Sequence, residues 1–331
     1  MVDEKKALNI VFMGTPGFAV PSLEKIIESG YRVVGVVTVA DKPAGRGYKL
    51  QESEVKKAAL KHELPVMQPS DLGDSSFLNQ LRTLKTNLIV VVAFRKMPEE
   101  LWRLPELGTF NLHGSLLPDY RGAAPLNWAV INGEKETGVT TFFLDEKIDT
   151  GALIDHAKIA IGENETVGQV HDKLMFIGAD LVLHTIQSIE KGEVKSVPQN
   201  KITVTKQIKK APKIFKKDCQ INWGKTAVEV HNLIRGLSPY PAAYTMLVHP
   251  NGKETKVKIY EAVLSSPNDS SADTEAEKGQ AGKIQTDQKN HLKVNCSSGS
   301  VDIWSLQPEG KRKMSVADFL RGKNLDGCIF S

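Results

Sequence analysis

The stretch Leu88-Ile-Val-Val-Val-Ala-Phe94 is the longest uninterrupted apolar run in the chain, and its β-branched residues predict a buried strand. Four other stretches have a similar strand-like character: Leu8–Met13, Val33–Val39, Gly108–His113 and Val139–Leu144. Segments of helix length separate most of these strands. Continuous apolar strands that alternate with helices are typical of a parallel sheet covered on both faces. We therefore expect an α/β fold with a doubly wound, mostly parallel sheet.

Helix ends in this part of the chain are marked by glycines. Residues Ser22 to Ser29 have helical spacing, and the pattern stops at Gly30. Thr166 to Lys191 predicts one long amphipathic helix, with Thr166 as its N-cap and Gly192 just past its end. We expect this long helix to close the first domain.

The pattern changes in the C-terminal part, where short strands replace the alternation of strands and helices. A short helix is expected from Thr226 to Arg235, and a last helix near Val316 to Arg321. Between them lie strand-like pieces at Lys256–Leu264, Gly282–Thr286, His291–Cys296 and Val301–Leu306. Several short strands with little helix predict a small β-barrel of the oligonucleotide-binding type.

Length and composition exclude several classes of protein. A chain of 331 residues with 40% hydrophobic and 25% charged residues is typical of about two globular domains. Its longest apolar run is far short of the roughly 18 residues that span a bilayer, and its N-terminus lacks the features of a signal peptide. We expect a cytoplasmic location. The three cysteines have neither a disulfide framework nor metal-binding spacing.

Positive charge is concentrated toward the C-terminus. Residues 1–205 carry a net charge of −3 and residues 206–331 a net charge of +7. Seven lysines and no acid lie between Lys201 and Lys217. This stretch is either a solvated linker or a surface that faces phosphates, and the basic character of the remaining C-terminal part favours the second. The segment 265–278 is rich in Ser, Asp and Glu, and we expect a mobile acidic loop there.

Two loops that contain glycine are candidate phosphate sites. Gly14-Thr-Pro-Gly17 lacks the full dinucleotide-binding pattern, and Pro16 removes a backbone donor, so a tight turn is the favoured interpretation. Asp41 to Lys49 (DKPAGRGYK) is not a Walker loop. It is either an ordinary connection or a basic finger for a polyanion.

The residues Asn111 and His113 are the best candidates for chemistry. Residues two apart on a strand face the same way, so both polar side chains share one face near the strand's C-terminal end. Open α/β sheets bind ligands at that end. A hydrogen-bonded core histidine is the alternative. Further on, the turn Leu144–Gly151 holds three carboxylates, and spacing does not decide whether one of them orients a histidine or all of them cap the turn.

With these residues in view, the sequence resembles the methionyl-tRNA formyltransferase family over nearly its whole length. The resemblance rests on Asn111-Leu-His113, on the later Asp149 within Ile-Asp-Thr-Gly, and on the loop Ser115-Leu116-Leu117-Pro118. The loop with Lys42 and Arg46, the lysine stretch and the final barrel resemble the parts with which that family holds tRNA. One departure is Ala93-Phe94-Arg95, where the family usually has Ala-Tyr-Gly.

The resemblance implies transfer of the formyl group of 10-formyltetrahydrofolate, which leaves as tetrahydrofolate, to methionyl initiator tRNA. We also expect a monomer that needs neither a metal nor a membrane. The resemblance implies a catalytic domain at residues 1–200, a basic linker at 201–217 and a tRNA-binding barrel at 218–331. The residues that it implies are, for catalysis, Asn111, His113 and Asp149; for folate, Ser115, Leu116, Leu117, Pro118, Phe94 and Arg95; and for tRNA, Lys42, Arg46, Lys206, Lys209, Lys210, Lys213, Lys216 and Lys217.

Two other functions stay open at this point. One is a folate-dependent formyltransferase or hydrolase with another acceptor, for which a basic linker and a barrel would be superfluous. The other is a non-catalytic RNA-binding protein, which would not need Asn111, His113 and Asp149 together.

Overall fold

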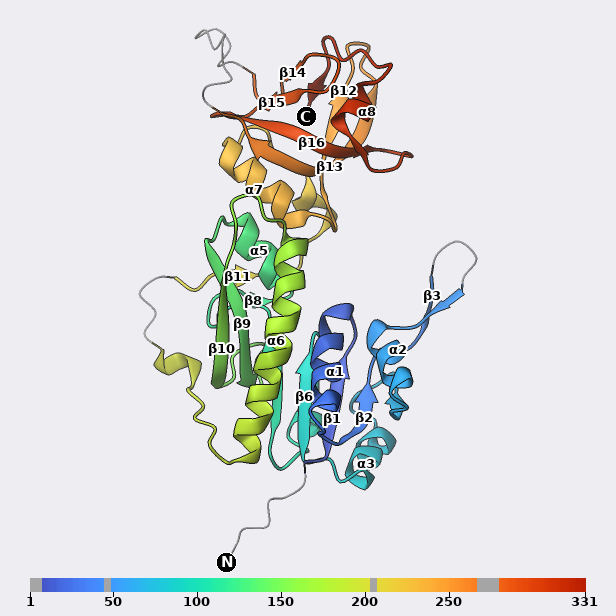
Figure 1. Cartoon of the computed structure of the whole chain (residues 1–331), viewed down its shortest axis with the longest axis vertical. Coiled ribbons are helices and arrows are strands. Elements are labelled where there is room, and N and C mark those ends of the chain that lie inside the picture. The colour runs from blue at the N-terminus through green and yellow to red at the C-terminus, as the bar shows by residue number, and fades with distance from the viewer. Residues whose placement is uncertain (1–7, 45–48, 203–206, 267–279) are drawn as a thin grey trace, which may run out of the picture. The chain divides into compact units, whose positions relative to one another are not determined.

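A computed structural model describes residues 8–44, 49–202, 207–266 and 280–331 (Figure 1). The chain forms two compact units. The first comprises Met1–Gly122, Thr137–Ile159 and His171–Lys210, and the second comprises Ala123–Glu136, Ala160–Val170 and Ala211–Ser331. Two segments from the middle of the chain thus belong to the C-terminal unit. The linear division at 201–217 that we expected from the sequence stays a prediction.

A seven-stranded sheet forms the centre of the first unit. Its strand order is β10-β9-β7-β6-β1-β2-β5. The strands are β1 (Ile10–Gly14), β2 (Val33–Val37), β5 (Val66–Met67), β6 (Leu88–Val92), β7 (Thr109–His113), β9 (Glu136–Phe143) and β10 (Leu153–Ala160). The five expected strands are therefore present, with β5 and β10 in addition.

One of the five expected strands, β9, is antiparallel to its neighbour, whereas the others pair in parallel. β1, β2, β5, β6 and β7 pair in parallel, but β9 runs antiparallel to β7. The chain between β7 and β9 passes through β8 (Arg121–Gly122) and α5 (Pro125–Ile131). Because α5 belongs to the second unit, no crossover helix on this sheet returns the chain for parallel pairing. The sheet is mostly parallel with an antiparallel edge.

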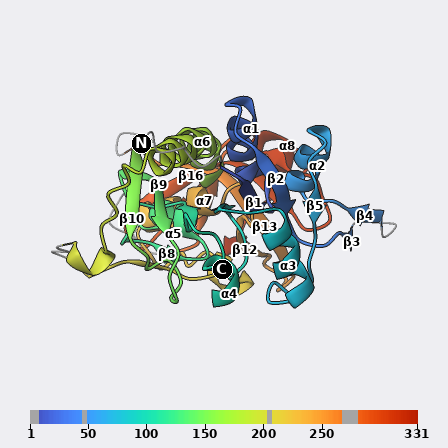
Figure 2. The same cartoon turned by 90° about the horizontal axis from the view of Figure 1, so that it is seen from below.

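Helices cover both faces of the sheet. Figure 2 shows α1, α2 and α6 on one side of the strands and α3 and α4 on the other. The helices are α1 (Val20–Glu28), α2 (Glu54–Lys61), α3 (Ser75–Thr83), α4 (Glu99–Trp102) and α6 (Val167–Glu190). Phe77 and Leu81 of α3 pack in one buried cluster with Val11 and Val91 of the sheet. Among the described helices, none combines the length and the apolar character needed to cross a membrane.

The long helix α6 has the ends that its sequence predicts. The Oγ1 of Thr166 accepts a hydrogen bond from the Gln169 amide, and Gln169 Oε1 accepts one from the Thr166 amide. Gly192 follows the helix at a φ of +70°. Inside the helix, a Cβ on Gly178 would lie 2.7 Å from Leu112 Cδ2. Glycine at this position therefore lets α6 lie close to β7.

The loop 41–49, expected as a connection or a basic finger, is part of a short hairpin. Strand β3 (Lys42–Ala44) pairs antiparallel with β4 (Lys49–Gln51). The base of the hairpin is held by Lys56 of α2, whose Nζ forms ion pairs with Asp41 and, at 3.0 Å, with Glu52. Arg46 lies outside the described residues.

The second unit is a nearly closed antiparallel barrel. Its strand order is β14-β15-β16-β13-β12-β18, with β17 paired to β16. A bridge between Lys283 and Ile329 joins the two ends of that order. The elements are α7 (Ala227–Leu237), β12 (Ala243–Val248), β13 (Glu254–Leu264), β14 (Ile284–Thr286), β15 (Leu292–Asn295), β16 (Ser300–Pro308), β17 (Met314–Ser315), α8 (Val316–Leu320) and β18 (Ile329–Phe330).

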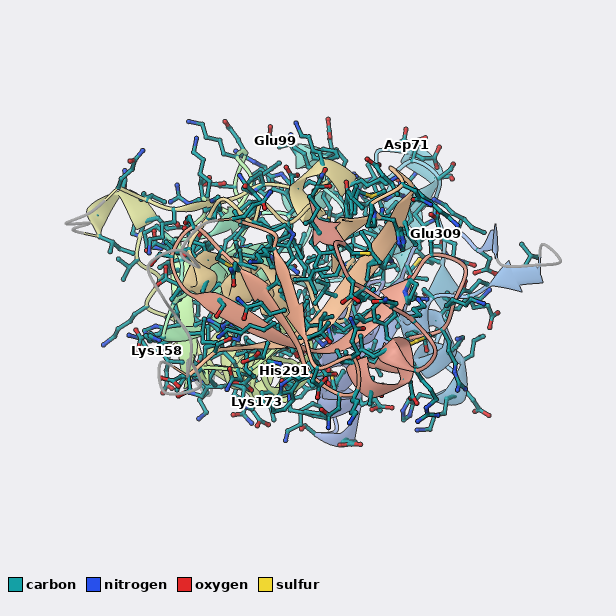
Figure 3. All side chains as sticks on the ribbon, turned by 90° about the horizontal axis from the view of Figure 1, so that it is seen from above. Asp71, Glu99, Lys158, Lys173, His291 and Glu309 are labelled. Atoms are coloured by element: carbon teal, nitrogen blue, oxygen red, sulfur yellow. The ribbon has the colours of Figure 1, made fainter. Side chains whose placement is uncertain are left out.

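The predicted barrel is confirmed, and the structure adds the strands β12, β17 and β18 to the four that we expected. Figure 3 shows the side chains on these strands, with His291 and Glu309 labelled at separate parts of the barrel. The helix expected from Thr226 to Arg235 is α7, and Thr226 is its N-cap, whose Oγ1 accepts from the backbone amide of Glu229. Most of the acidic stretch that we expected at 265–278 lies outside the described residues.

Candidate active site

Asn111 and His113 lie on β7 as the strand alternation predicts. Phe110 and Leu112 are 0% and 3% exposed, and Leu112 packs against α6. Asn111 and His113 take the alternate positions, where His113 is 6% exposed and Asn111 is half-buried. A polar pair therefore stands at the carboxyl end of a central strand, the part of an open α/β sheet that binds ligands.

Asp149 is the carboxylate of the following turn that lies beside His113. Its Oδ2 is 3.8 Å from His113 Nδ1, and both side chains are largely buried. The same Oδ2 accepts a hydrogen bond from the Gly122 amide at 3.0 Å. Asp145 instead accepts from the Thr150 hydroxyl and the Lys147 amide, as a turn-capping residue does. The structure thus resolves which acid of this turn faces the histidine.

The other ring nitrogen of His113 forms a hydrogen bond with the backbone. Nε2 lies 2.9 Å from the carbonyl oxygen of Tyr120, which only accepts hydrogen bonds, so Nε2 carries the proton. In the neutral imidazole the lone pair is then on Nδ1, the atom nearest Asp149. His113 can take up a proton at Nδ1 without breaking its bond to Tyr120.

The loop Ser115–Pro118 is held by hydrogen bonds to Asp119 and to Thr140 of β9. Ser115 Oγ donates to the Asp119 carbonyl at 2.7 Å, and Thr140 Oγ1 donates to the Ser115 carbonyl at 2.6 Å. Thr140 Oγ1 also accepts from the Leu117 amide at 3.2 Å. Strand β9 therefore fixes this loop immediately after His113.

Phe94 and Arg95 follow β6, the neighbour of β7. Phe94 packs partly against the buried cluster under α3, whereas Arg95 is exposed. The Arg95 guanidinium donates to the carbonyl oxygens of Ser70 and Pro69 at 3.0 and 2.6 Å. The cation that departs from the family pattern is thus directed toward the loop after β5.

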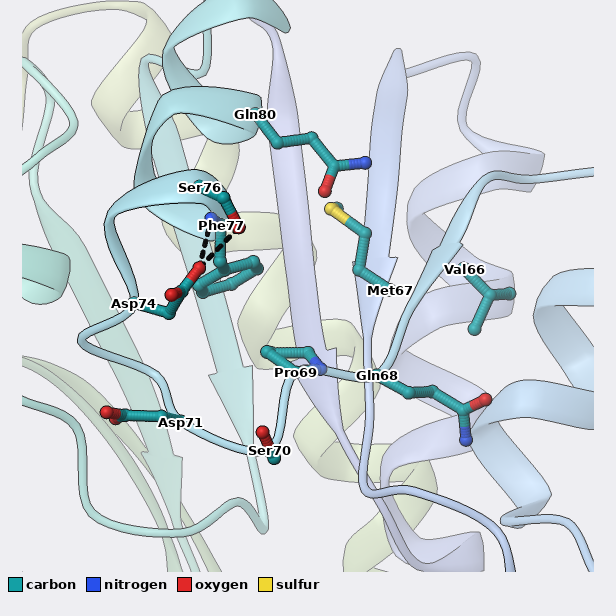
Figure 4. Close-up of a pocket in the computed structure, with 10 residues that line it drawn as sticks. All are labelled: Val66, Met67, Gln68, Pro69, Ser70, Asp71, Asp74, Ser76, Phe77 and Gln80. Carbon is teal, nitrogen blue, oxygen red and sulfur yellow. Dashed lines mark hydrogen bonds between the residues drawn. The ribbon is translucent and has the colours of Figure 1, made fainter.

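A pocket of about 270 Å³ lies next to that loop (Figure 4). Its walls come from β5, the 68–74 loop and α3, and Gln68, Asp71 and Asp74 are polar groups that line it. Asp74 is the N-cap of α3 and accepts from the Phe77 amide. None of Asn111, His113 and Asp149 lines this pocket, so the pocket is separate from the site that these three residues form.

The lysines that we expected to meet tRNA are exposed wherever the structure describes them. Lys209 and Lys210 belong to the first unit, and Lys213, Lys216 and Lys217 to the second. Lys42 is exposed on β3. Lys213 Nζ lies 5.8 Å from the centre of the Phe215 ring, whose side chain is itself exposed. Lys206 lies outside the described residues.

Sequence reasoning missed one buried polar residue of this region, Gln199, which hydrogen-bonds to the Asp149 loop. Its partners are 48 to 78 residues away along the chain, so no local pattern marks it. Among the described residues, no group of three or more His, Cys, Asp or Glu side chains is placed to hold a metal ion.

A mostly parallel sheet with an amide, an imidazole and a carboxylate near the carboxyl ends of its strands is an arrangement typical of α/β enzymes. The chain belongs to the formyl transferase family. Residues 8–186 match the formyl transferase model, and residues 213–324 match the model of the formyl transferase C-terminal domain.

Relatives with high identity cover nearly the whole chain. A methionyl-tRNA formyltransferase of Bacteroides fragilis is 50% identical over 322 residues, which is 97% of each chain. One of Flavobacterium johnsoniae is 50% identical over 315 residues, 95% of this chain and 96% of its own.

Solved structures share the fold at lower identity. A sugar 3N-formyl transferase, WlaRD, solved in the presence of dTDP and 5-N-formyl-THF, has a TM-score of 0.63 at 21% identity and covers 92% of this chain and 99% of its own. HypX from Aquifex aeolicus, in complex with tetrahydrofolic acid, has a TM-score of 0.62 at 18% identity and covers 97% of this chain and 48% of its own.

Proposed function

We propose that this chain transfers the formyl group of 10-formyltetrahydrofolate to the α-amine of methionyl initiator tRNA and releases tetrahydrofolate. The observation that carries the proposal is that Asp149 lies beside His113 at the end of the strand that also carries Asn111. The full-length relatives named methionyl-tRNA formyltransferase support the choice of acceptor. The solved relatives with folate compounds support a folate donor.

The chemical demand of this reaction lies in the tetrahedral intermediate. A free α-amino group has a pKa of roughly 7.7 to 8.0, and the neighbouring ester lowers it, so much of the amine is already neutral near pH 7. The amine nitrogen attacks the formyl carbon, whose oxygen becomes negative. The bond from that carbon to the folate nitrogen then breaks, and the folate nitrogen takes a proton.

Each polar side chain of the site has a part in these steps. The Asn111 amide NH2 donates to the developing oxyanion. His113 accepts the amine proton at Nδ1 and passes it to the leaving nitrogen, while Nε2 keeps its bond to Tyr120. Asp149, 3.8 Å from Nδ1, stabilises the imidazolium that forms between the two transfers. No step requires a metal.

The folate would lie against two loops that flank β7. These are the loop Ser115, Leu116, Leu117 and Pro118 and the loop with Phe94 and Arg95. The first loop is fixed by β9 through Thr140, and the second is tied to the 69–70 backbone by Arg95. Both can therefore hold the donor in a constant position relative to Asn111.

The lysines would neutralise phosphates of the tRNA. The described ones are Lys42, Lys209, Lys210, Lys213, Lys216 and Lys217, and the proposal also includes Arg46 and Lys206. If about four phosphates are neutralised, log K falls with log salt at a slope near −3 to −4. Replacing Lys213, Lys216 and Lys217 by Ala should reduce that slope by about 2 to 3. Lys61→Ala, at an exposed position paired with Glu24, should leave it unchanged.

The decisive experiment uses the intact chain with labelled 10-formyltetrahydrofolate and charged initiator tRNA, beside charged elongator methionine tRNA. We expect label in the initiator product alone, from a monomeric enzyme. Label in a small amine or free formate in place of tRNA would favour another acceptor or a hydrolase. Binding of tRNA without formyl release would favour a non-catalytic RNA-binding protein.

The proposal has consequences for domain organisation and location. A catalytic domain at 1–200, a basic linker at 201–217 and a tRNA-binding barrel at 218–331 would divide the work between donor chemistry and tRNA binding. An enzyme that supplies formylated initiator tRNA would act in the cytoplasm, where translation initiates.

A further inference from the structure

The buried glutamine Gln199 has no part in the reaction steps above. It begins the short 3-10 helix Gln199–Lys201 and is 5% exposed. Its Nε2 donates to the carbonyl oxygens of Asp149 and Gly151, at 3.1 and 2.8 Å. Its Oε1 accepts from Nε and Nη2 of Arg121, at 3.0 and 2.5 Å. One amide thus joins three segments of the first unit.

These bonds hold the Asp149 loop from two directions. Gln199 binds the main chain of the loop on both sides of Thr150. The Gly122 amide binds the Asp149 carboxylate, and Gly122 is the chain neighbour of Arg121, which Gln199 also binds. Gln199 therefore supports Asp149 twice: it binds the Asp149 carbonyl directly, and through Arg121 it holds the segment whose Gly122 amide binds the carboxylate.

The backbone of Asp149 needs such support. Asp149 has a φ of +57°, in the left-handed region that residues other than glycine rarely adopt. That conformation persists only where the surroundings hold it. Without the two bonds from Gln199, the loop can relax and carry the carboxylate away from His113.

We propose that Gln199 is a positioning residue for formyl transfer, which keeps the Asp149 carboxylate beside His113 Nδ1. This inference rests on the proposed function. Gln199 itself is not a catalytic residue, because its amide is used by Arg121 and the loop carbonyls.

The chemistry of the side chain explains why glutamine suits this position. Its NH2 group supplies two donors for two carbonyl oxygens, and its oxygen supplies an acceptor for the guanidinium. A glutamate has the same length and keeps the pairing with Arg121, but its second oxygen, an acceptor, faces the two carbonyl oxygens and cannot donate to them. A leucine fills similar space with neither function.

The test compares steady-state kinetics of Gln199→Leu and Gln199→Glu with the wild-type chain. We expect kcat to fall about 10- to 100-fold in both, as when a supporting partner of a reactive group is removed. KM for 10-formyltetrahydrofolate and for methionyl-tRNA should stay within about twofold. Gln80→Leu, at an exposed position of α3, is the control and should behave as wild type.

A double-mutant cycle separates positioning from a general loss of structure. In an Asp149→Ala background, Gln199→Leu should cause no further loss of kcat, because the group that it positions is absent. Losses that multiply in the double variant, unchanged kcat in both single variants, or unfolding of both by circular dichroism would overturn the proposal. Wild-type transfer to methionyl-tRNA is measured first, so failure of the proposed function is seen separately.

Discussion

His113 and His231 are both buried, at 6% and 3% exposure, but their surroundings differ in charge. His113 stands at the end of β7 with the Asp149 carboxylate 3.8 Å from Nδ1. His231 lies on α7 in the second unit, where the cation of Arg235 and the more weakly acting carboxylate of Glu163 influence it. Burial, together with Arg235, lowers the pKa of His231 to about 4.

The comparison shows that burial alone does not make a histidine suitable for proton transfer. A histidine with a pKa of about 4 stays neutral near pH 7, so His231 does not collect a proton from an amine. His231 Nε2 also has no hydrogen-bond partner among the described groups. His113 instead has the Asp149 carboxylate 3.8 Å from its Nδ1, and Nε2 hydrogen-bonds to the Tyr120 carbonyl.

The largest effect is expected for His113→Ala. Because the variant removes the group that takes and returns the proton, kcat should fall about 10²- to 10⁴-fold. Tight binding of donor and tRNA should persist, since neither is proposed to depend on the imidazole. Single-turnover formyl transfer measures the loss, and His231→Gln is the matched control at a buried histidine. A loss of kcat in that control as large as in His113→Ala would mean that the two buried histidines do not differ in their importance for the reaction.

Asn111→Ala is expected to have the next largest effect. Loss of one donor to a developing oxyanion commonly costs about 10²- to 10³-fold in rate. The formyl-transfer rate at saturating substrates should show it, with Asn79→Ala on the exposed face of α3 as the control. A change confined to KM would mean that Asn111 binds substrate and does not stabilise the charge.

Asp149→Asn removes the difference in charge between the two histidines while keeping the shape of the side chain. The amide oxygen can still accept from Gly122, so the loop should keep its place. We expect kcat to fall about 10- to 100-fold, because the imidazolium loses its counter-charge. A rate equal to wild type, measured over several pH values, would show that the carboxylate has no electrostatic part in the reaction.

The sequence predicts best what depends on local periodicity. The shared face of Asn111 and His113 follows from strand alternation, and the ends of α6 follow from Thr166 and Gly192. The strand β12 was missed because one of its buried positions is the polar residue Thr245. Its hydroxyl accepts a hydrogen bond from Trp223 Nε1 and donates one to the Ser331 carbonyl. An alternation of apolar residues does not reveal a buried threonine of this kind.

Contacts between segments that are far apart in the sequence cannot be predicted from local sequence patterns. Three acids of one turn are equivalent by spacing, and only the turn conformation brings Asp149 to His113. Gln199 is marked by no motif, because its partners come from other parts of the chain. The antiparallel β9 depends in the same way on where the preceding connection runs.

His231 makes the stability of the folded chain depend on pH. The unfolded chain binds a proton at His231 with a pKa near 6.5, and the folded chain with a pKa of about 4. Between these values the unfolded state holds more protons, so the free energy of unfolding falls as the pH falls. For this site the loss at pH 4.5 is roughly 2 kcal/mol relative to pH 7.

Urea unfolding at pH 7 and pH 4.5 measures this loss, with His231→Gln as the comparison because it does not titrate. Some carboxylates also lose stabilisation as the pH falls, because hydrogen bonds from Ser76 and from the Thr226 backbone lower the pKa values of Asp74 and Glu229, and the pKa of Asp287 is lowered to about 2. Wild type and variant share these groups, so their contributions cancel in the difference between the two proteins. An equal loss of stability in wild type and variant would place the proton uptake elsewhere, and His231 would then not differ from His113 in the way that its neighbours indicate.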